Sequence, residues 1–202
     1  MMLPRRVVLA TGNAGKLREM AALLAPLQLQ ILPLTALGIV GADETGTTFD
    51  ANALLKARHA AQAAQLPALA DDSGIEVDAL GGRPGVWSAR YAGPAATDAD
   101  NNALLLRELA EVPAGQRSAR YRCVIAYVRH ADDAAPLLAR GTWEGTIASA
   151  PAGAAGFGYD PLFIPAGGAG TAAQLAPAAK NAVSHRGQAL AELLRLLQAD
   201  AR

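Results

Sequence analysis

The sequence is poor in cysteine and in lysine. Cys123 is the only cysteine among 202 residues, so no internal disulfide can form and no metal site can be built from a cysteine cluster. A reducing, cytoplasmic location fits this usage best. Because a lysine ammonium is a compact point charge that arginine does not reproduce, the few lysines are candidate functional positions, with chance survival at the surface as the alternative. Against fifteen arginines there are three lysines, Lys16, Lys56 and Lys180.

An excess of charge of either sign is also missing. The 18 basic and 18 acidic residues give a formal net charge of +0 and are scattered along the chain. Proteins that bind polymeric nucleic acid usually carry a basic stripe, so we expect no such partner. The uncharged stretch at residues 161–179 contains three prolines and three glycines, which argues against a membrane span there. The apolar run at residues 7–10 is too short for a signal-peptide core.

Aromatic residues make up only 4% of the chain, and alanine accounts for much of its 51% hydrophobic content. The core must therefore rely on leucine, isoleucine and valine. A chain of this length can bury enough surface for one substantial core, so we expect a single domain over residues 1–202, divided into two lobes around a cleft.

The hydrophobic pattern predicts an α/β fold with a central mixed, twisted sheet and flanking helices. A nearly continuous apolar run at residues 122–128 is expected to pair with residues 137–147 as an antiparallel hairpin, across the polar turn at Asp132-Asp133. Thr47 with Asp50, and Thr97 with Asp100, are expected to cap two of the helices. The expected strands are residues 7–10, 31–34, 68–70, 75–79, 122–128 and 137–147, and the expected helices are residues 17–24, 47–64 and 97–110 and a last one from residue 184.

The first predicted turn, Thr11-Gly12-Asn13-Ala14-Gly15-Lys16, is typical of a phosphate-binding loop. Backbone N–H groups in a glycine-rich turn and the positive end of the following helix attract anions. It is not a Walker A loop, because too few residues separate the first glycine from the Gly-Lys pair and Leu17 follows. A plain turn between strand and helix is the alternative.

Asp71 and Asp72 follow the predicted strand at residues 68–70. Ligands of open α/β sheets bind beyond the carboxyl ends of strands, so both carboxylates are candidates for ligand binding, with a cap or a solvated turn as the alternative. Glu44, in a polar loop, could complete a Mg²⁺ site with Asp72, because Mg²⁺ takes one or two carboxylates plus substrate phosphates. The alternative interpretation of Glu44, taken without Asp72, is a solvated acid of the loop.

Two further pairs of residues are candidates for ligand binding. Phe157 and Tyr159 lie among glycines, where each could stack on a base or join the core. His185 and Arg186, at the start of the last predicted helix, supply donors beside a helix end that favours anions, with a simple capping histidine as the alternative. No metal-ligand spacing links the histidines, and no Gly-x-Ser-x-Gly nucleophile elbow occurs.

Five short motifs run in order from the first predicted strand to the last predicted helix. They are Leu9-Ala10-Thr11-Gly12-Asn13 with Gly15-Lys16, Ala70-Asp71-Asp72-Ser73-Gly74, Ser88-Ala89-Arg90-Tyr91, Gly156-Phe157-Gly158-Tyr159-Asp160-Pro161 and Ser184-His185-Arg186-Gly187. Together they closely resemble the inosine/xanthosine triphosphate pyrophosphatase (HAM1-like) family. The resemblance implies Mg²⁺-dependent hydrolysis of the deaminated purine nucleoside triphosphates ITP, dITP and XTP to the monophosphate and pyrophosphate. It also implies a homodimer that cleanses the nucleotide pool.

The same resemblance implies a role for each candidate residue. Asp72 is the expected general base and, with Glu44, the expected Mg²⁺ ligand, while Lys56 is expected near the phosphates and Ser73 in contact with substrate. The phosphates would be held by Thr11, Gly12, Asn13, Ala14, Gly15 and Lys16. The nucleoside and base pocket would be formed by Phe157, Gly158, Tyr159, Asp160, Lys180, His185 and Arg186.

Two other functions would use the same residues. A nucleotide sensor without catalysis gains nothing from adjacent carboxylates facing a polyphosphate unless a metal neutralises them, so the acids argue against it. A related pyrophosphatase acting on modified pyrimidine or ordinary nucleotides would differ in substrate ranking. For deaminated purines, donors from Arg186, His185 or backbone N–H groups would satisfy the 6-oxygen and oppose the 6-amino group of adenine.

Overall fold

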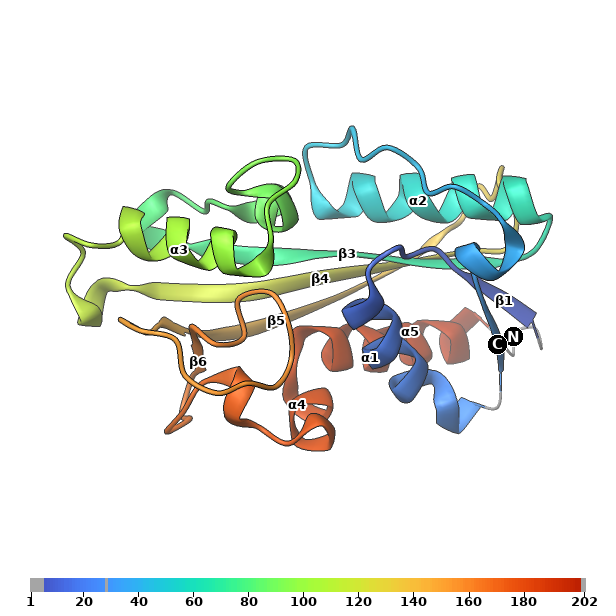
Figure 1. The fold of residues 1–202 in the computed structure, drawn as a ribbon. Coiled ribbons are helices and arrows are strands. Elements are labelled where there is room, and N and C mark those ends of the chain that lie inside the picture. The colour runs from blue at the N-terminus through green and yellow to red at the C-terminus, as the bar shows by residue number, and fades with distance from the viewer. Residues whose placement is uncertain (1–5, 28, 201–202) are drawn as a thin grey trace. The chain divides into compact units, whose positions relative to one another are not determined.

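A computed structural model describes residues 6–27 and 29–200 and confirms the α/β class. Six strands form one mixed sheet in the order β2-β1-β3-β4-β5-β6, with helices flanking it (Figure 1). Strand β1 pairs in parallel with β2 and β3, whereas β6 pairs antiparallel with β5. The strands are β1 (Arg6–Leu9), β2 (Gln30–Pro33), β3 (Ala68–Val77), β4 (Ser118–Val128), β5 (Leu137–Ile147) and β6 (Phe163–Pro165).

The helices are of two kinds. The α-helices are α1 (Ala14–Leu24), α2 (Phe49–Ala64), α3 (Asp98–Glu108), α4 (Pro177–Val183) and α5 (His185–Asp200). The short 3-10 helices are η1 (Ala25–Leu27), η2 (Leu34–Leu37), η3 (Asp78–Leu80), η4 (Gly85–Arg90), η5 (Ala114–Gln116) and η6 (Ala172–Gln174). Among the described residues, no helix combines the length and the hydropathy that a membrane span requires.

The chain divides into two compact units, called unit 1 and unit 2 below. Unit 1 comprises Met1–Asp72, Cys123–Gly141 and Arg186–Arg202, and unit 2 comprises Ser73–Arg122 and Thr142–His185. Residues 1–5, 28 and 201–202 lie outside the described residues. The expectation of one bilobal domain with a cleft between its lobes stays a prediction.

Unit 1 is built on the buried strand β1. Helix α2 covers one face of its strands, and α1 and α5 cover the other (Figure 1). The helical period predicts one apolar face of α1 with Leu17, Met20, Ala21 and Leu24. Met20 and Leu24 are buried, whereas Ala21 is exposed. The core of this unit consists of Val7, Leu9, Met20, Leu24, Leu69, Cys123, Ile125, Tyr127, Ala139, Ala189, Leu190, Leu193 and Leu197.

The N-cap of α2 lies one residue later than predicted. The hydroxyl of Thr48 accepts a hydrogen bond from the Ala51 N–H at 3.1 Å, so Thr48 is the N-cap and the expected cap at Thr47 is wrong. Asp50 lies in the first turn, where its charge favours the positive helix end. The capping box predicted at the start of α3 is present.

Unit 2 contains an aromatic core. The ring of Tyr121 in β4 lies 4.8 Å from that of Phe163 and 6.5 Å from that of Trp143, measured between centroids. Leu105 and Leu109 are fully buried and belong to the same cluster. Three of the few aromatic residues are thus concentrated here, where their large apolar area compensates for the small alanines elsewhere.

Strand β3 corrects the prediction of two strands separated by a loop. It runs without interruption from Ala68 to Val77, so Asp71 and Asp72 lie within the strand and not after its end. Both carboxylates are buried and paired with lysines of unit 1. Because these ion pairs compensate the buried charges, the two aspartates do not have to lie in a solvated loop. The short elements β6 and α4 were also missed, because the alanine- and glycine-rich stretch around them shows no periodicity.

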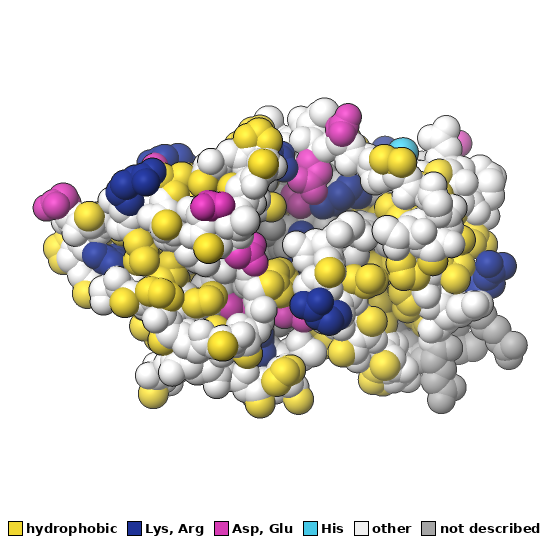
Figure 2. Space-filling model, in the orientation of Figure 1, with side chains coloured by type: hydrophobic (Ala, Val, Ile, Leu, Met, Phe, Trp, Pro, Cys, Tyr) yellow, Lys and Arg dark blue, Asp and Glu magenta, His cyan; other side chains and the backbone are white. Residues whose placement is uncertain are grey.

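The charged side chains on the face shown in Figure 2 occur in small groups of both signs, with hydrophobic side chains between them. No continuous basic stripe is visible on that face.

Candidate active site

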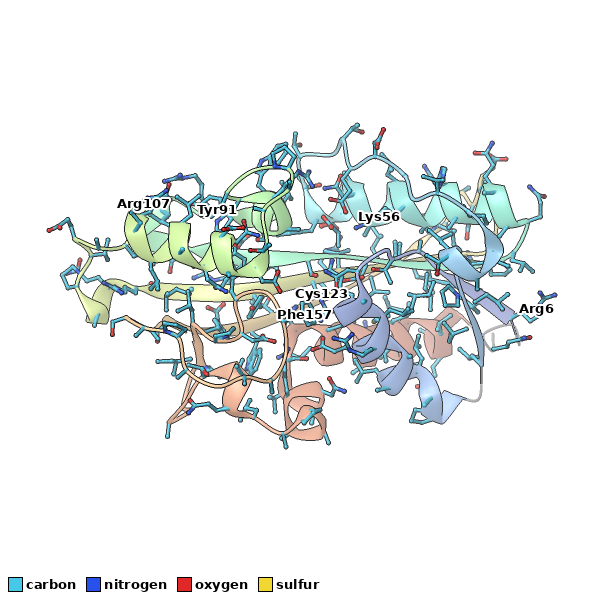
Figure 3. All side chains as sticks on the ribbon, in the orientation of Figure 1. Arg6, Lys56, Tyr91, Arg107, Cys123 and Phe157 are labelled. Carbon is cyan, nitrogen blue, oxygen red and sulfur yellow. The ribbon has the colours of Figure 1, made fainter. Side chains whose placement is uncertain are left out.

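Lys56 is the centre of a charged cluster in unit 1. It projects from α2 toward β3 (Figure 3), and its Nζ lies 2.7 Å from Glu44 Oε1 and 2.9 Å from Asp72 Oδ1. The side chains of Lys56 and Asp72 are only 12% and 6% exposed. The structure therefore brings together three residues that the sequence singled out, with one ammonium between two carboxylates.

Asn52 connects this cluster internally. Its Nδ2 donates to Asp72 Oδ2 at 3.2 Å, and its Oδ1 accepts the Gly46 N–H at 2.8 Å. A side chain at Gly46 would place its Cβ 2.6 Å from the same Oδ1, so the close approach requires glycine. Asn52 thus ties the loop of Glu44 to β3. Its one sequence signal was a spacing of four residues from Lys56, which puts both on one helix face.

The environment changes the protonation of both central groups. Burial raises the pKa of Asp72 above its usual value, although Lys56 and Lys16 oppose the change. Burial alone would lower the pKa of Lys56, but the carboxylates of Asp72, Asp71 and Glu44 outweigh it and raise that pKa. Lys56 therefore stays charged, while Asp72 is a carboxylate with increased affinity for a proton.

Asp71, the neighbour of Asp72 in β3, pairs with different cations. Its Oδ2 lies 3.2 Å from Lys16 Nζ and 3.5 Å from Arg186 Nε. Burial alone would raise the pKa of Asp71, but Lys16 and Arg186 hold it well below its usual range. Two adjacent aspartates in one strand therefore have opposite shifts in pKa. Successive side chains of a strand point to opposite faces, which gives each its own partners.

The predicted phosphate loop joins β1 to α1 in unit 1. Asn13 caps α1, because its Oδ1 accepts the Lys16 N–H at 3.0 Å, and the Asn13 N–H donates to Thr11 Oγ1 at 3.2 Å. Gly12, Asn13 and Ala14 are exposed, whereas Gly15 is buried against the rest of the unit. The exposed backbone at the positive end of an 11-residue helix is suited to an anion.

The residues of the cluster fit a magnesium ion that arrives with a polyphosphate. Mg²⁺ is commonly held by one or two carboxylates together with substrate phosphates. Glu44 and Asp72 already share a cation, the Lys56 ammonium, through oxygens 2.7 and 2.9 Å from its Nζ. Within the described residues, no group of three or more His, Cys, Asp or Glu side chains could hold a metal by itself. The donor set is thus one that needs phosphate oxygens to complete it.

The glycine-rich loop of unit 2 is organised by Asp160. Its carboxylate accepts the Phe157 N–H at 2.9 Å and a hydrogen bond from the Lys180 ammonium, which lies 5.1 Å from the centre of the Phe157 ring. Gly156 has a φ of +78°, and a side chain there would overlap the Asp160 carboxylate. The loop therefore holds Phe157 and Lys180 together, and Phe157 remains partly exposed.

Tyr159 and His185 belong to the core of unit 2. The hydroxyl of the buried Tyr159 donates to the Ser88 carbonyl at 2.8 Å, which decides for Tyr159 between the stacking and core alternatives. The buried ring of His185 is stacked on Tyr121, with centroids 4.5 Å apart and an angle of 6° between the planes.

The predicted site residues therefore form two groups, one in each unit. Unit 1 holds residues 11–16, Glu44, Lys56, Asp72 and Arg186, and unit 2 holds Ser73, residues 157–160, Lys180 and His185.

Comparison with known proteins gives a consistent result. The model of the Ham1 family matches residues 7–196 of the chain. The chain belongs to the Ham1 family. It is 56% identical to a protein of Shigella flexneri named dITP/XTP pyrophosphatase, over 96% of this chain and 98% of that protein. It is 57% identical to a protein of Yersinia pseudotuberculosis with the same name, with the same coverage.

Solved structures of Ham1 proteins have the same fold. A HAM1 protein from Coxiella burnetii is 48% identical and superposes with a TM-score of 0.88, covering 97% of this chain and 100% of that one. The Ham1 protein of Staphylococcus aureus is 36% identical with a TM-score of 0.83, covering 96% and 99% of the two chains. The resemblance read from five motifs is thereby confirmed at the level of the family and of the fold.

Proposed function

We propose that the chain hydrolyses deaminated purine nucleoside triphosphates, ITP, dITP and XTP, to the nucleoside monophosphate and pyrophosphate. The observation that carries the proposal is the cluster in which the Lys56 ammonium lies within 3 Å of both Glu44 and Asp72. The names of relatives more than half identical over nearly the whole chain support the same substrates. Such an enzyme would remove triphosphates with deaminated bases from the nucleotide pool, and we propose that it acts in the cytoplasm.

Asp72 is the general base of the proposed reaction. Its carboxylate takes a proton from the attacking water, the water oxygen bonds to phosphorus, and the P–O bond of the α–β anhydride breaks to release pyrophosphate. The raised pKa of Asp72 suits this role, because a base is most effective when its pKa approaches the working pH. Lys56 keeps the Asp72 carboxylate in place, and Asn52 fixes its second oxygen.

Glu44 and Asp72 would hold the Mg²⁺ ion, which when bound neutralises negative charge on the phosphates. The phosphates would be held by residues 11–16, where the exposed backbone of the loop and the Lys16 ammonium offer donors and positive charge. Lys56 adds a second ammonium near the reacting anhydride.

The base would be bound by residues of unit 2. Phe157 can stack on any purine, and Lys180 beside it can donate to the 6-oxygen that distinguishes hypoxanthine and xanthine from adenine. Each buried donor left facing the adenine amino group costs about 1 to 3 kcal/mol, so two donors would discriminate by roughly 10² to 10⁴-fold. Gly158, Asp160 and His185 would complete the base pocket, as the resemblance implies, and Ser73 would contact the substrate. We also propose a homodimer, as the resemblance implies, and sedimentation would test it.

Pyrophosphate release is the assay that tests the function. The protein is mixed with ITP, XTP, ATP and a modified pyrimidine triphosphate at alkaline pH, with Mg²⁺ or with EDTA. We expect rapid release from ITP and XTP, little from ATP, and none with EDTA. No release from any of the four would favour a nucleotide sensor, whereas a preference for the pyrimidine or ATP would assign the chain a different substrate class.

A further inference from the structure

A buried network lies behind the predicted phosphate loop in unit 1. Lys16 Nζ and Arg186 Nε approach the same carboxylate oxygen, Asp71 Oδ2, at 3.2 and 3.5 Å. The guanidinium of Arg186 also donates to Glu19 on α1. The network therefore runs Glu19–Arg186–Asp71–Lys16 and joins three elements, α1, β3 and the start of α5.

The members of this network differ in their access to solvent. The side chains of Asp71 and Arg186 are 0% and 2% exposed, whereas that of Lys16 is 15% exposed. The Lys16 side chain is thus partly open to solvent, whereas the carboxylate with which it pairs is not. Two acids and two bases make the network neutral, so its buried charges are compensated before any ligand arrives.

We propose that Asp71 is a positioning residue, which holds the Lys16 ammonium where the triphosphate binds, and that Arg186 and Glu19 hold Asp71 in turn. The catalytic consequence rests on the function proposed above. A flexible lysine side chain loses much rotamer entropy when a bound ligand fixes it. If Asp71 already holds the Lys16 ammonium in the free protein, substrate binding no longer carries that entropy cost. This gives Arg186 a positioning role through Asp71, whereas the resemblance implies a place for Arg186 in the base pocket.

Lysine labelling tests the positioning directly, without nucleotide. With lysine in only three positions, selective ¹³C labelling of the wild-type protein gives three ε-methylene NMR signals, and Lys16→Ala identifies that of Lys16. We expect two inequivalent, slowly averaging ε protons for Lys16. In Asp71→Asn they should become equivalent, as in a mobile lysine, while the Lys56 signal is unchanged. Equivalent, mobile ε protons of Lys16 in the wild-type protein overturn the proposal, whether or not Asp71→Asn folds.

A double-mutant cycle tests the catalytic consequence. We expect Lys16→Ala to lower kcat/KM for ITP by about 10² to 10³-fold and Asp71→Asn to lower it by roughly 10- to 100-fold with a raised KM, as for a misplaced group. In the Lys16→Ala background, Asp71→Asn should cost less than about 2-fold, because the residue it positions is already gone. Losses that multiply independently refute the coupling.

Asp133→Asn is the matched control. Asp133 is also a buried carboxylate of unit 1 that pairs with an arginine. Its Oδ2 accepts hydrogen bonds from the backbone nitrogen and from Nη1 of Arg129, both at 2.9 Å. It differs from Asp71 in its position, the turn between β4 and β5. It should lose stability while kcat/KM stays within about 2-fold of wild type. If wild type itself releases no pyrophosphate from ITP, the proposed function fails, and the NMR result still decides whether Asp71 positions Lys16.

Discussion

The opposite pKa shifts of Asp71 and Asp72 predict opposite consequences for stability when each is replaced by asparagine. The charge of Asp71 is favoured in the folded protein, because Lys16 and Arg186 outweigh its burial. Removing one partner of a buried ion pair typically costs about 3 to 5 kcal/mol. At roughly 2 to 4 °C per kcal/mol for a chain of this size, Asp71→Asn should lower the melting temperature by about 6 to 20 °C.

Asp72 should behave differently, because burial makes its charge costly in the folded protein. Asparagine removes that cost, and Lys56 keeps its contact with Glu44 at 2.7 Å. Against this, the new side-chain NH2 group of the variant can face the Asn52 Nδ2 donor. The hydrogen bond between the two side chains is then lost, which costs about 1 kcal/mol. The two effects nearly cancel, so Asp72→Asn should change the melting temperature by less than about 4 °C.

The dependence on pH separates the two cases further. The folded pKa of Asp71 lies below its unfolded value of about 3.8, so the advantage of wild type over Asp71→Asn is complete above that pH and shrinks only in stronger acid. The folded pKa of Asp72 lies above 3.8, so the cost of its charge is present at neutral pH and disappears as pH falls toward 4. Relative to wild type, Asp72→Asn should therefore lose ground between pH 7 and pH 4.

Thermal melts followed by circular dichroism, in EDTA and without nucleotide, measure both variants under the same conditions. The reasoning is refuted if Asp72→Asn lowers the melting temperature as much as Asp71→Asn does.

Three further predictions concern activity and the loop of unit 2. Asp72→Asn should remove the proton acceptor and lower kcat at least about 10²-fold, and a variant that keeps more than about a tenth of wild-type kcat contradicts the assignment. Arg186→Ala should lower kcat/KM for ITP and ATP by the same factor, within about 3-fold, if Arg186 acts through its ion pairs with Asp71 and Glu19. A narrower ratio of kcat/KM between ITP and ATP would assign Arg186 to base recognition. Gly156→Ala should lower stability more than Gly158→Ala in chemical denaturation, because both glycines have positive φ but only the first has a neighbour within 4 Å.

The local features of the fold could be predicted from the sequence because their signals are local. Strand β5 has the predicted bounds, residues 137–147, because the polar turn at Asp132-Asp133 indicates where the second strand of a hairpin begins. The capping box of α3 is encoded by two residues three apart. The three lysines stood out by scarcity, and each forms an ion pair with a buried or half-buried acid.

The contacts that build the site could not be predicted in the same way. Glu19 and Arg186 are 167 residues apart, and neither position carries a signal that names the other. The continuity of β3 depends on cations from other elements, which neutralise acids that by themselves suggest a loop. Asn52 was visible only as a polar position on α2. Such pairings are set by the tertiary fold, which the hydrophobic pattern describes only in outline.

The single cysteine has a practical consequence. Cys123 is 1% exposed in the core of unit 1, and burial raises the pKa of its thiol to about 12. The thiolate is the species that reacts with disulfide reagents and oxidants, and it is nearly absent at neutral pH under these conditions. The folded protein is therefore inert toward a chromogenic disulfide, whereas opening of unit 1 exposes one thiol per chain. The rate at which Cys123 reacts with the reagent therefore measures how often that core opens, and no cysteine has to be introduced by mutation.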